Sequence, residues 1–261
     1  MNNMTKNTAS TALSTALSKV PELTLIFWVI KILATTLGET AGDALSMSMN
    51  LGYLVSTAFF AALFFVAVIA QIKAKQFHPF IYWTTIVATT TVGTTLADYA
   101  DRSLGIGYTG GTALLLSLLL ASLLIWYKTL GSVSVNTIRE PKAEMFYWMT
   151  IMFSQTLGTA LGDWTADTAG LGYGGGAVIF SALLLVVLAA YYWTQISRTA
   201  LFWAAFIITR PLGAVVGDFL DKPIAKGGLD FSRFGASATL LAVIVACILF
   251  FPQRAGKSAG H

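Results

Sequence analysis

The sequence predicts an all-α membrane protein with eight transmembrane helices, built from four parallel repeats of two helices each. Three observations support this fold class. Of the 261 residues, 56% are hydrophobic and only 11% are charged, whereas soluble domains carry about 25% charged residues. Apolar runs of about 20 residues, long enough to cross a bilayer, recur along the chain. One residue pattern also occurs four times at nearly even spacing.

The expected helices follow one another with short connections. They are 23–43, 52–72, 80–99, 109–128, 145–164, 174–194, 199–219 and 234–251. Glycine-rich segments separate the two helices of each repeat, and they are interpreted as tight turns or, alternatively, as a flexible lid. The chain then divides into a polar N-terminal tail (1–21), repeats one and two (22–130), a central cytoplasmic loop (131–144), repeats three and four (145–251) and a polar C-terminal tail (252–261).

The recurring pattern is Trp, nine residues, Gly, three residues, a small residue and Asp. Because each repeat holds an even number of helices, all copies cross the membrane in the same direction. The distance between the second and third tryptophans is longer than the other two, and its extra residues fall in the polar segment 131–144. This predicts a boundary between two half-proteins. The steps are 55, 65 and 55 residues between the tryptophans of the four copies, Trp28, Trp83, Trp148 and Trp203.

Basic residues predict the orientation of the chain. Lys and Arg concentrate in the termini and in the segments 73–78, 128–144 and 195–200, and basic residues mark the cytoplasmic side. Both termini are therefore expected in the cytoplasm, and the net charge of +4 indicates a lipid-facing basic surface with no nucleic-acid partner. The opposite side carries only Arg102, Lys222, Lys226 and Arg233.

Each copy of the pattern ends in an aspartate. Fifteen residues, or about 22 Å along a helix, separate the Trp from the Asp. If the Trp marks the inner aromatic belt, the Asp lies beneath the outer boundary of a hydrocarbon layer about 30 Å thick. Carboxylates at one depth predict a ring or two facing pairs, and such crowded carboxylates need a cation, a proton or an arginine; the alternative role is a helix-end cap at a wet interface. The four are Asp43, Asp98, Asp163 and Asp218.

Small residues precede each aspartate at GxxxG-type spacing, which lets transmembrane helices approach closely. Helix packing is their expected role, and close packing would bring the aspartates together. The tryptophans are expected to anchor the helices at the membrane interface. The packing glycines are Gly38, Gly42, Gly93, Gly158, Gly162, Gly213 and Gly217, with Ala97 in the remaining position.

Further polar residues accompany the four aspartates. Glu39 lies four residues before Asp43 and is the deepest additional acid; Asp101, Asp167 and Asp221 are either vestibule acids or solvated loop acids. Oxygen ligands suit hard ions such as Mn²⁺, Mg²⁺ or Ca²⁺, whereas a thiolate or imidazole site for zinc or copper is not expected. Nearby hydroxyl and amide groups would support a cation or bond to the helix backbone, namely Thr36, Thr91, Gln155 and Thr156.

Two basic residues lie inside the predicted spans. Repeat four carries Arg210, followed by Pro211, where the other copies have Thr35, Thr90 and Gln155. We expect Arg210 to pair with a neighbouring acid and Pro211 to kink the helix. Lys31 is expected to snorkel to the inner surface, with a gating role coupled to Glu39 as the alternative.

The Trp, Gly and Asp positions over residues 22–251 resemble an uncharacterised bacterial membrane-protein family of four tandem repeats, each with two transmembrane segments and a characteristic Trp. The resemblance implies eight helices and a multi-pass protein of the bacterial inner membrane. It implies no substrate.

The residues favour a secondary transporter of cations, of the divalent Mn/Mg/Ca class, that exchanges the ion for protons at the repeated aspartates. A proton, monovalent-cation or organic-cation pathway is the alternative within transport, and a membrane scaffold is the alternative outside it. No enzyme is expected, because no Ser/His, His/Glu or Cys/His constellation is present. No tightly bound cofactor is expected. The expected partners are the lipid bilayer and the cation, and the sequence leaves open whether the protein forms a homo-oligomer.

Overall fold

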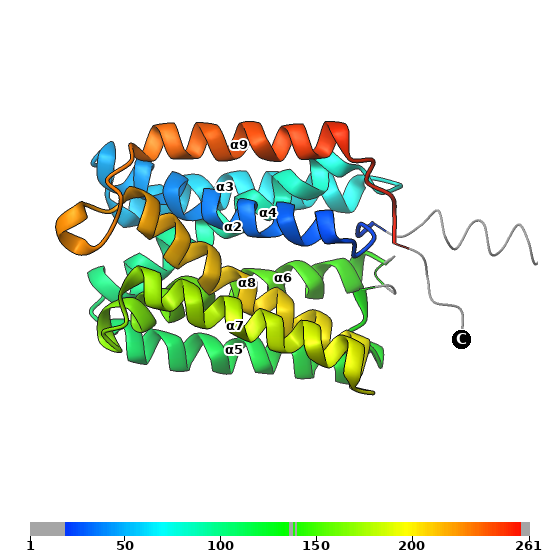
Figure 1. The fold of residues 1–261 in the computed structure, drawn as a ribbon. Coiled ribbons are helices and arrows are strands. Elements are labelled where there is room, and N and C mark those ends of the chain that lie inside the picture. The colour runs from blue at the N-terminus through cyan, green and yellow to red at the C-terminus, as the bar shows by residue number, and fades with distance from the viewer. Residues whose placement is uncertain (1–18, 136–137, 139, 257–261) are drawn as a thin grey trace, which may run out of the picture.

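The structure is a computed structural model that describes residues 19–135, 138 and 140–256. This part of the chain is all-α, and eight long helices confirm four repeats of two helices (Figure 1). The predicted tail at 1–21 lies almost wholly outside the described residues. The helices are α2 (Leu25–Asp43), α3 (Gly52–Lys73), α4 (Pro79–Asp98), α5 (Gly107–Leu130), α6 (Pro141–Asp163), α7 (Gly172–Trp193), α8 (Arg198–Asp221) and α9 (Arg233–Phe250).

One boundary differs from the prediction. Helix α6 begins at Pro141, inside the predicted central loop 131–144. Glu140 precedes the helix with extended backbone, and proline is favoured in the first helical turn because it needs no hydrogen-bond acceptor there. The central loop is therefore shorter than predicted.

The first helices of the four repeats form a closed inner bundle. These inner helices, α2, α4, α6 and α8, pack in that order, and α8 returns onto α2. The outer helices pack one place further round the ring, so that α3 lies on α4, α5 on α6 and α7 on α8. Helix α9 closes the circle by packing on α2 (Figure 1). Residues of repeats one and four, distant in sequence, are thereby neighbours.

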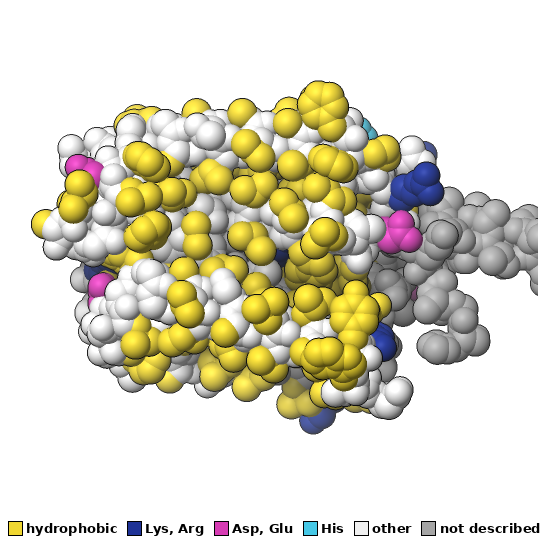
Figure 2. Space-filling view, viewed as in Figure 1, with side chains coloured by type: hydrophobic (Ala, Val, Ile, Leu, Met, Phe, Trp, Pro, Cys, Tyr) yellow, Lys and Arg dark blue, Asp and Glu magenta, His cyan; other side chains and the backbone are white. Residues whose placement is uncertain are grey.

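Apolar side chains cover the long sides of the bundle, and charged side chains gather at its two ends (Figure 2). Six of the described helices are long and apolar enough to span a membrane; the other two, α4 and α6, are inner helices. Helix α4 contains seven threonines, and six of them lie in the protein interior, where they need no contact with lipid. The chain is a multi-pass membrane protein.

The bundle has two distinct ends. The terminal end carries residues 19–24 and 251–256, which lie together, with Glu22 N–H donating to the Arg254 carbonyl at 2.9 Å. Lys19 Nζ lies 2.5 Å from Glu144 Oε1 at this end. The opposite end, where α2, α4 and α6 each finish at an aspartate, is the acidic end.

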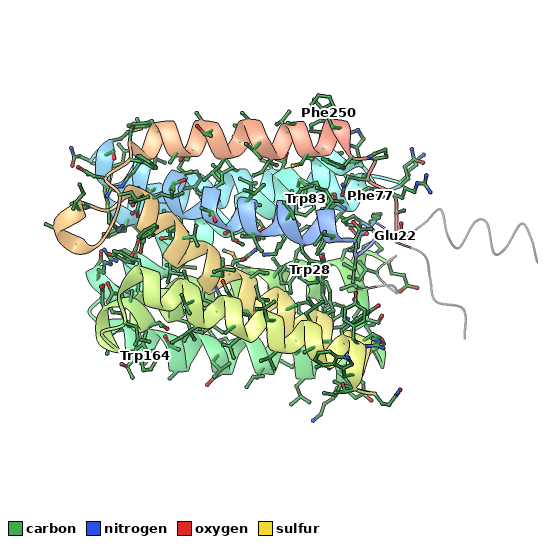
Figure 3. All side chains as sticks on the ribbon, in the orientation of Figure 1. Glu22, Trp28, Phe77, Trp83, Trp164 and Phe250 are labelled. Atoms are coloured by element: carbon green, nitrogen blue, oxygen red, sulfur yellow. The ribbon has the colours of Figure 1, made fainter. Side chains whose placement is uncertain are left out.

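Tryptophans form an aromatic core near the terminal end. Trp83, Trp148 and Trp203 are buried and Trp28 is half-buried; Trp83 and Trp28 lie beside the inner helices in Figure 3. Trp203 Nε1 donates to the Val133 carbonyl at 3.0 Å. The prediction of interfacial anchors is wrong for the three buried tryptophans, because the inner helices are surrounded by other helices.

Glycines set the spacing of the inner helices. A Cβ on Gly38 would come within 3.0 Å of Thr90, and a Cβ on Gly158 would do the same to Arg210. Corresponding close contacts join Gly93 to Gln155 and Gly213 to Thr35. In all four cases the first glycine of the pattern packs against a side chain of the next inner helix, and that side chain lies seven residues after its Trp. The fourth contact runs from α8 to α2 and so completes the ring.

This arrangement predicts that Gly158→Ala destabilises the protein. The new methyl group would meet the Cβ and Cγ atoms of Arg210, and overpacking of this kind costs about 1–3 kcal/mol. Gly174→Ala is the matched control, since a Cβ there meets nothing within 4 Å. Thermal unfolding in detergent should show a lower melting temperature for Gly158→Ala alone. Equal melting temperatures would contradict close packing at Gly158.

The inner helices of repeats one to three end alike. Five-residue π-helical segments follow the aspartates, η1 (Ala44–Ser48), η2 (Tyr99–Ser103) and η4 (Trp164–Thr168). Repeat four departs from this, because α8 continues to Asp221 and a longer loop with the 3-10 turn η5 (Ile224–Lys226) precedes α9. π-helical turns are rare and occur often at functional sites, and here η2 carries Arg102, which contacts Asp98 and Asp163.

Candidate functional site

The four repeated aspartates are buried at the acidic end. They lie as two bridged pairs, each held by one basic side chain. Lys222 contacts both Asp43 and Asp218, with 3.0 Å from Nζ to Asp218 Oδ1. Arg102 bridges the other pair, at 2.9 Å from Nε to Asp98 Oδ1 and 3.2 Å from Nη2 to Asp163 Oδ2.

The bridging bases come from alternate repeats. Arg102 follows Asp98 by four residues and Lys222 follows Asp218 by four, whereas the same position holds Met47 in repeat one. Each base therefore reaches the aspartate of its own repeat and that of the next repeat round the ring. In the sequence, Arg102 and Lys222 stand out only as charges on the outer side of the membrane. The i, i+4 spacing of acid and base on one helical face was the signal that could have identified them.

A third base joins the cluster from the start of α9. Arg233 Nε lies 3.1 Å from Asp221 Oδ2 and 3.8 Å from Asp43 Oδ2. Asp221 is 4% exposed, so it is not a solvated loop acid. The base holds it inside the site.

The remaining accompanying acids differ from one another. Asp167 is exposed, as a solvated loop acid would be. Asp101 is buried, and neither of its carboxylate oxygens has a hydrogen-bond partner among the described residues. It faces Gly111 of α5, where any Cβ would collide with the carboxylate. The solvated-loop interpretation is therefore wrong for Asp101, and that acid belongs to the interior.

The acidic end holds more acids than bases. In the described part of the chain, three bases at this end form ion pairs with the buried acids, Arg102, Lys222 and Arg233, and a fourth, Lys226, is exposed. Carboxylates in excess of their counter-ions repel one another unless they hold protons or cations. The buried carboxylates number six, namely Asp43, Asp98, Asp101, Asp163, Asp218 and Asp221.

Three of these carboxylates form a compact trio. One oxygen each from Asp43, Asp218 and Asp221 lies within 4.8 Å of the others. Asp218 Oδ1 contacts Lys222, whereas the Oδ1 atoms of Asp43 and Asp221 lack a hydrogen-bond partner within the described residues. Burial lowers the pKa of Lys222, which lies just beyond α8, but the neighbouring Asp218 and Asp43 raise that pKa well above its ordinary value. Lys222 is thus held as a cation on the trio.

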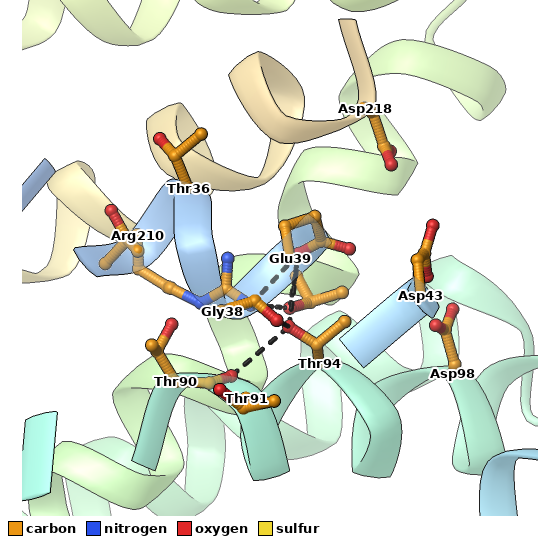
Figure 4. Close-up of polar contacts among 12 residues, drawn as sticks. Thr36, Gly38, Glu39, Asp43, Thr90, Thr91, Thr94, Asp98, Arg210 and Asp218 are labelled. Carbon is orange, nitrogen blue, oxygen red and sulfur yellow. Dashed lines mark hydrogen bonds and ion pairs between the residues drawn. The ribbon is translucent and has the colours of Figure 1, made fainter. Parts of the chain in front are cut away.

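A second charged group lies in the middle of the inner bundle (Figure 4). Arg210 Nη2 lies 3.1 Å from Glu39 Oε2 and donates to Thr94 Oγ1 at 2.6 Å and to Thr159. Thr94 Oγ1 also donates to Glu39 Oε2 at 3.3 Å. Each of the four residues comes from a different inner helix. We call this group the central lock, because one ion pair with two hydroxyls ties all four inner helices together.

Lys31 does not reach the inner surface. It is wholly buried, and its Nζ lies 4.1 Å from the centre of the Phe206 ring without a hydrogen-bond partner among the residues that the structure describes. The snorkelling prediction is therefore wrong. The reason is that α2 is an inner helix, so that its polar side chain meets α8 instead of lipid or headgroups.

The supporting residues are turned toward their own helices. Thr36, Thr91 and Thr156 each donate to the carbonyl four residues earlier, at 3.0, 2.7 and 2.9 Å. Gln155 is buried, and its amide has no partner within the described residues. Glu39 contacts Arg210 and not the aspartates. The structure thus brings the four aspartates together but places Glu39 and these polar residues in a separate layer.

Comparison with known proteins finds four matching segments. Residues 26–77, 81–131, 146–197 and 201–254 match the family described as Repeat of Unknown Function (DUF347). These segments coincide with the helix pairs α2–α3, α4–α5, α6–α7 and α8–α9. No curated protein matches the chain, and no solved structure matches it. Four tandem matches cover most of the sequence, and the chain belongs to this repeat family.

Proposed function

We propose that this protein is a secondary transporter that exchanges cations for protons at the acidic end. Divalent ions of the Mn²⁺, Mg²⁺ and Ca²⁺ class are the proposed substrates, and the bacterial inner membrane, with both termini in the cytoplasm, is the proposed location. The observation that carries the proposal is the surplus of buried carboxylates at the acidic end, where the described residues include six such acids and three bases that pair with them. The proposed role is not enzymatic and requires no resident cofactor.

The trio of Asp43, Asp218 and Asp221 supports a divalent substrate. Carboxylate oxygens are preferred ligands of hard cations, and these three side chains converge within 4.8 Å. Lys222 contacts two of these carboxylates, those of Asp43 and Asp218, so an incoming ion competes with a tethered ammonium group. When the ion leaves, protons and Lys222 restore the charge balance, which couples cation and proton movement.

The central lock supports a carrier. Glu39 and Arg210 pair across the bundle at a buried level between the two ends. A continuous path for ions along the bundle axis would have to open this pair. Transport then requires two conformations, as expected for a secondary transporter whose halves are parallel repeats.

An organic cation is the second candidate substrate. Arg102 is itself an organic cation held by two carboxylates, with its guanidinium carbon 6.0 Å from the Tyr53 ring centre and 5.7 Å from that of Tyr108. Aromatic faces beside carboxylates are favourable for such cations. Guanidinium therefore belongs in any panel of test ions.

Uptake into proteoliposomes tests the proposal. The purified full-length protein should carry Mn²⁺, Mg²⁺ or Ca²⁺ inward, and the flux should change the internal pH because ions exchange for protons. Asp163→Asn removes one buried carboxylate of the cluster and should reduce uptake to the level of protein-free liposomes. Asp167→Asn, at an exposed acid four residues further on, should leave uptake at the wild-type rate.

The other hypotheses give different results in the same assay. Guanidinium uptake without divalent uptake would favour the organic-cation pathway. If folded wild-type protein carries none of the ions and responds to no pH step, the transporter proposal is wrong and the scaffold interpretation stands.

A further inference from the structure

A layer of polar side chains lies between the aromatic core and the central lock. Several of its polar atoms have no hydrogen-bond partner within the described residues, although their side chains are 0% exposed. Buried polar groups in native proteins are nearly always paired, and an unpaired one lowers the stability of the fold. The unpaired atoms are Lys31 Nζ, Thr90 Oγ1, Gln155 Nε2 and Oε1, and Arg210 Nε and Nη1.

The layer also carries unbalanced charge. Lys31 and Arg210 are two buried basic groups whose positive charges would repel one another, and the ion pair described for Arg210 is with Glu39, through Nη2. Lys31 forms no ion pair with any described residue, and its ammonium group lies over the face of Phe206, a position that favours the charged form. With both groups protonated, one positive charge is left without a partner among the described residues, at a depth where an unpaired charge is very costly unless a counter-ion accompanies it.

The two basic groups meet because the ring of inner helices is closed by the packing of α8 on α2. Lys31 stands where repeats two and three have Ile86 and Ile151, and Arg210 stands where repeat one has Thr35. Repeats one and four each supply one exceptional cation, and the packing of α8 on α2 brings the two together. The coincidence of both exceptions in one layer indicates a specific binding role.

We propose that this layer binds a small monovalent anion of halide size. Lys31 Nζ and the free Nε and Nη1 of Arg210 supply positive charge, and the Gln155 amide and Thr90 hydroxyl supply further donors. Water would satisfy the hydrogen bonds but not the charge, and a cation would add to the repulsion. The anion neutralises the pair of cations and holds α2, α6 and α8 together beneath the central lock.

Anion-dependent thermal stability tests the site. The protein in detergent is thermally unfolded in sodium chloride and in sodium gluconate at matched ionic strength, since gluconate is a much larger anion than chloride. Chloride should raise the melting temperature in a saturable manner, by about 5 °C at full occupancy. Lys31→Gln should lose this chloride-specific rise, while Lys226→Gln, at an exposed lysine beyond the acidic end, should keep it.

Bromide provides a direct measurement that does not depend on a variant. Anomalous scattering from crystals grown in bromide should place one ion between Lys31 and Arg210. If Lys31→Gln does not fold, Lys31→Arg keeps the charge and should keep the chloride effect. Equal melting temperatures in chloride and gluconate, a chloride effect that persists in Lys31→Gln, or no bromide at this layer would each overturn the proposal. None of these readouts depends on transport.

Discussion

Replacing Arg210 with methionine should destabilise the protein more than any substitution on its surface. The change leaves Glu39 buried at 2% exposure without its cationic partner, and removing one member of a buried ion pair costs about 3–5 kcal/mol. The hydroxyls of Thr94 and Thr159 also lose their contact with Arg210 Nη2. A clear fall in melting temperature in detergent is the expected result.

A double-mutant cycle separates pairing from packing. Glu39→Gln keeps the size of the side chain but removes its charge, so combining it with Arg210→Met should recover part of the lost stability. Arg198→Met, at an exposed arginine of the same helix, is the control for loss of one positive charge. Strict additivity of the two central changes, or a loss no greater than that of Arg198→Met, would show that the pair does not hold the bundle together.

Replacing Lys222 with glutamine should make the stability of the protein depend on divalent cations. The substitution removes the ammonium group that contacts Asp43 and Asp218 and leaves their carboxylates, with that of Asp221, short of positive charge. Loss of a buried partner again costs about 3–5 kcal/mol without added metal. Millimolar Mn²⁺ or Ca²⁺ should restore the melting temperature in a saturable manner, since a ligand that binds only the folded state stabilises it.

The control for Lys222→Gln is Lys226→Gln, because Lys226 is exposed and only four residues away. That variant should behave as wild type with and without metal. Potassium at matched ionic strength should not substitute for Mn²⁺ if the carboxylate trio is a site and not merely a charged surface. Rescue that is equally strong with potassium, or absent with every divalent ion, would remove the structural support for divalent substrates.

The acidic end and the central lock differ in charge and lie at different levels along the bundle axis. The acidic end offers carboxylates in excess of bases, whereas the middle of the bundle is closed by Arg210 and Glu39. The two levels lie one helical turn apart on α2, since Glu39 precedes Asp43 by four residues. Under the proposed function, helix α2 would connect proton or cation binding at Asp43 to the ion pair of Glu39 with Arg210, because Asp43 and Glu39 lie on this one helix.

The sequence by itself determined the helices, the repeats and the packing glycines. Hydropathy and glycine spacing are local properties, so they predicted eight helices close to the observed bounds, apart from the early start of α6 at Pro141. The Trp-to-Asp spacing also predicted that the aspartates share one depth, because each lies fifteen residues after its Trp on a continuous helix.

Only the tertiary structure decided which charges meet. Lys222 and Asp43 lie 179 residues apart in sequence and Arg210 and Glu39 lie 171 apart, and no local pattern specifies such pairs. The inward positions of Lys31 and of three tryptophans were likewise missed, because hydropathy does not tell which helices of a bundle face lipid. The packing of α8 and α9 on α2 closes the ring, and this closure joins the ends of the chain into one site.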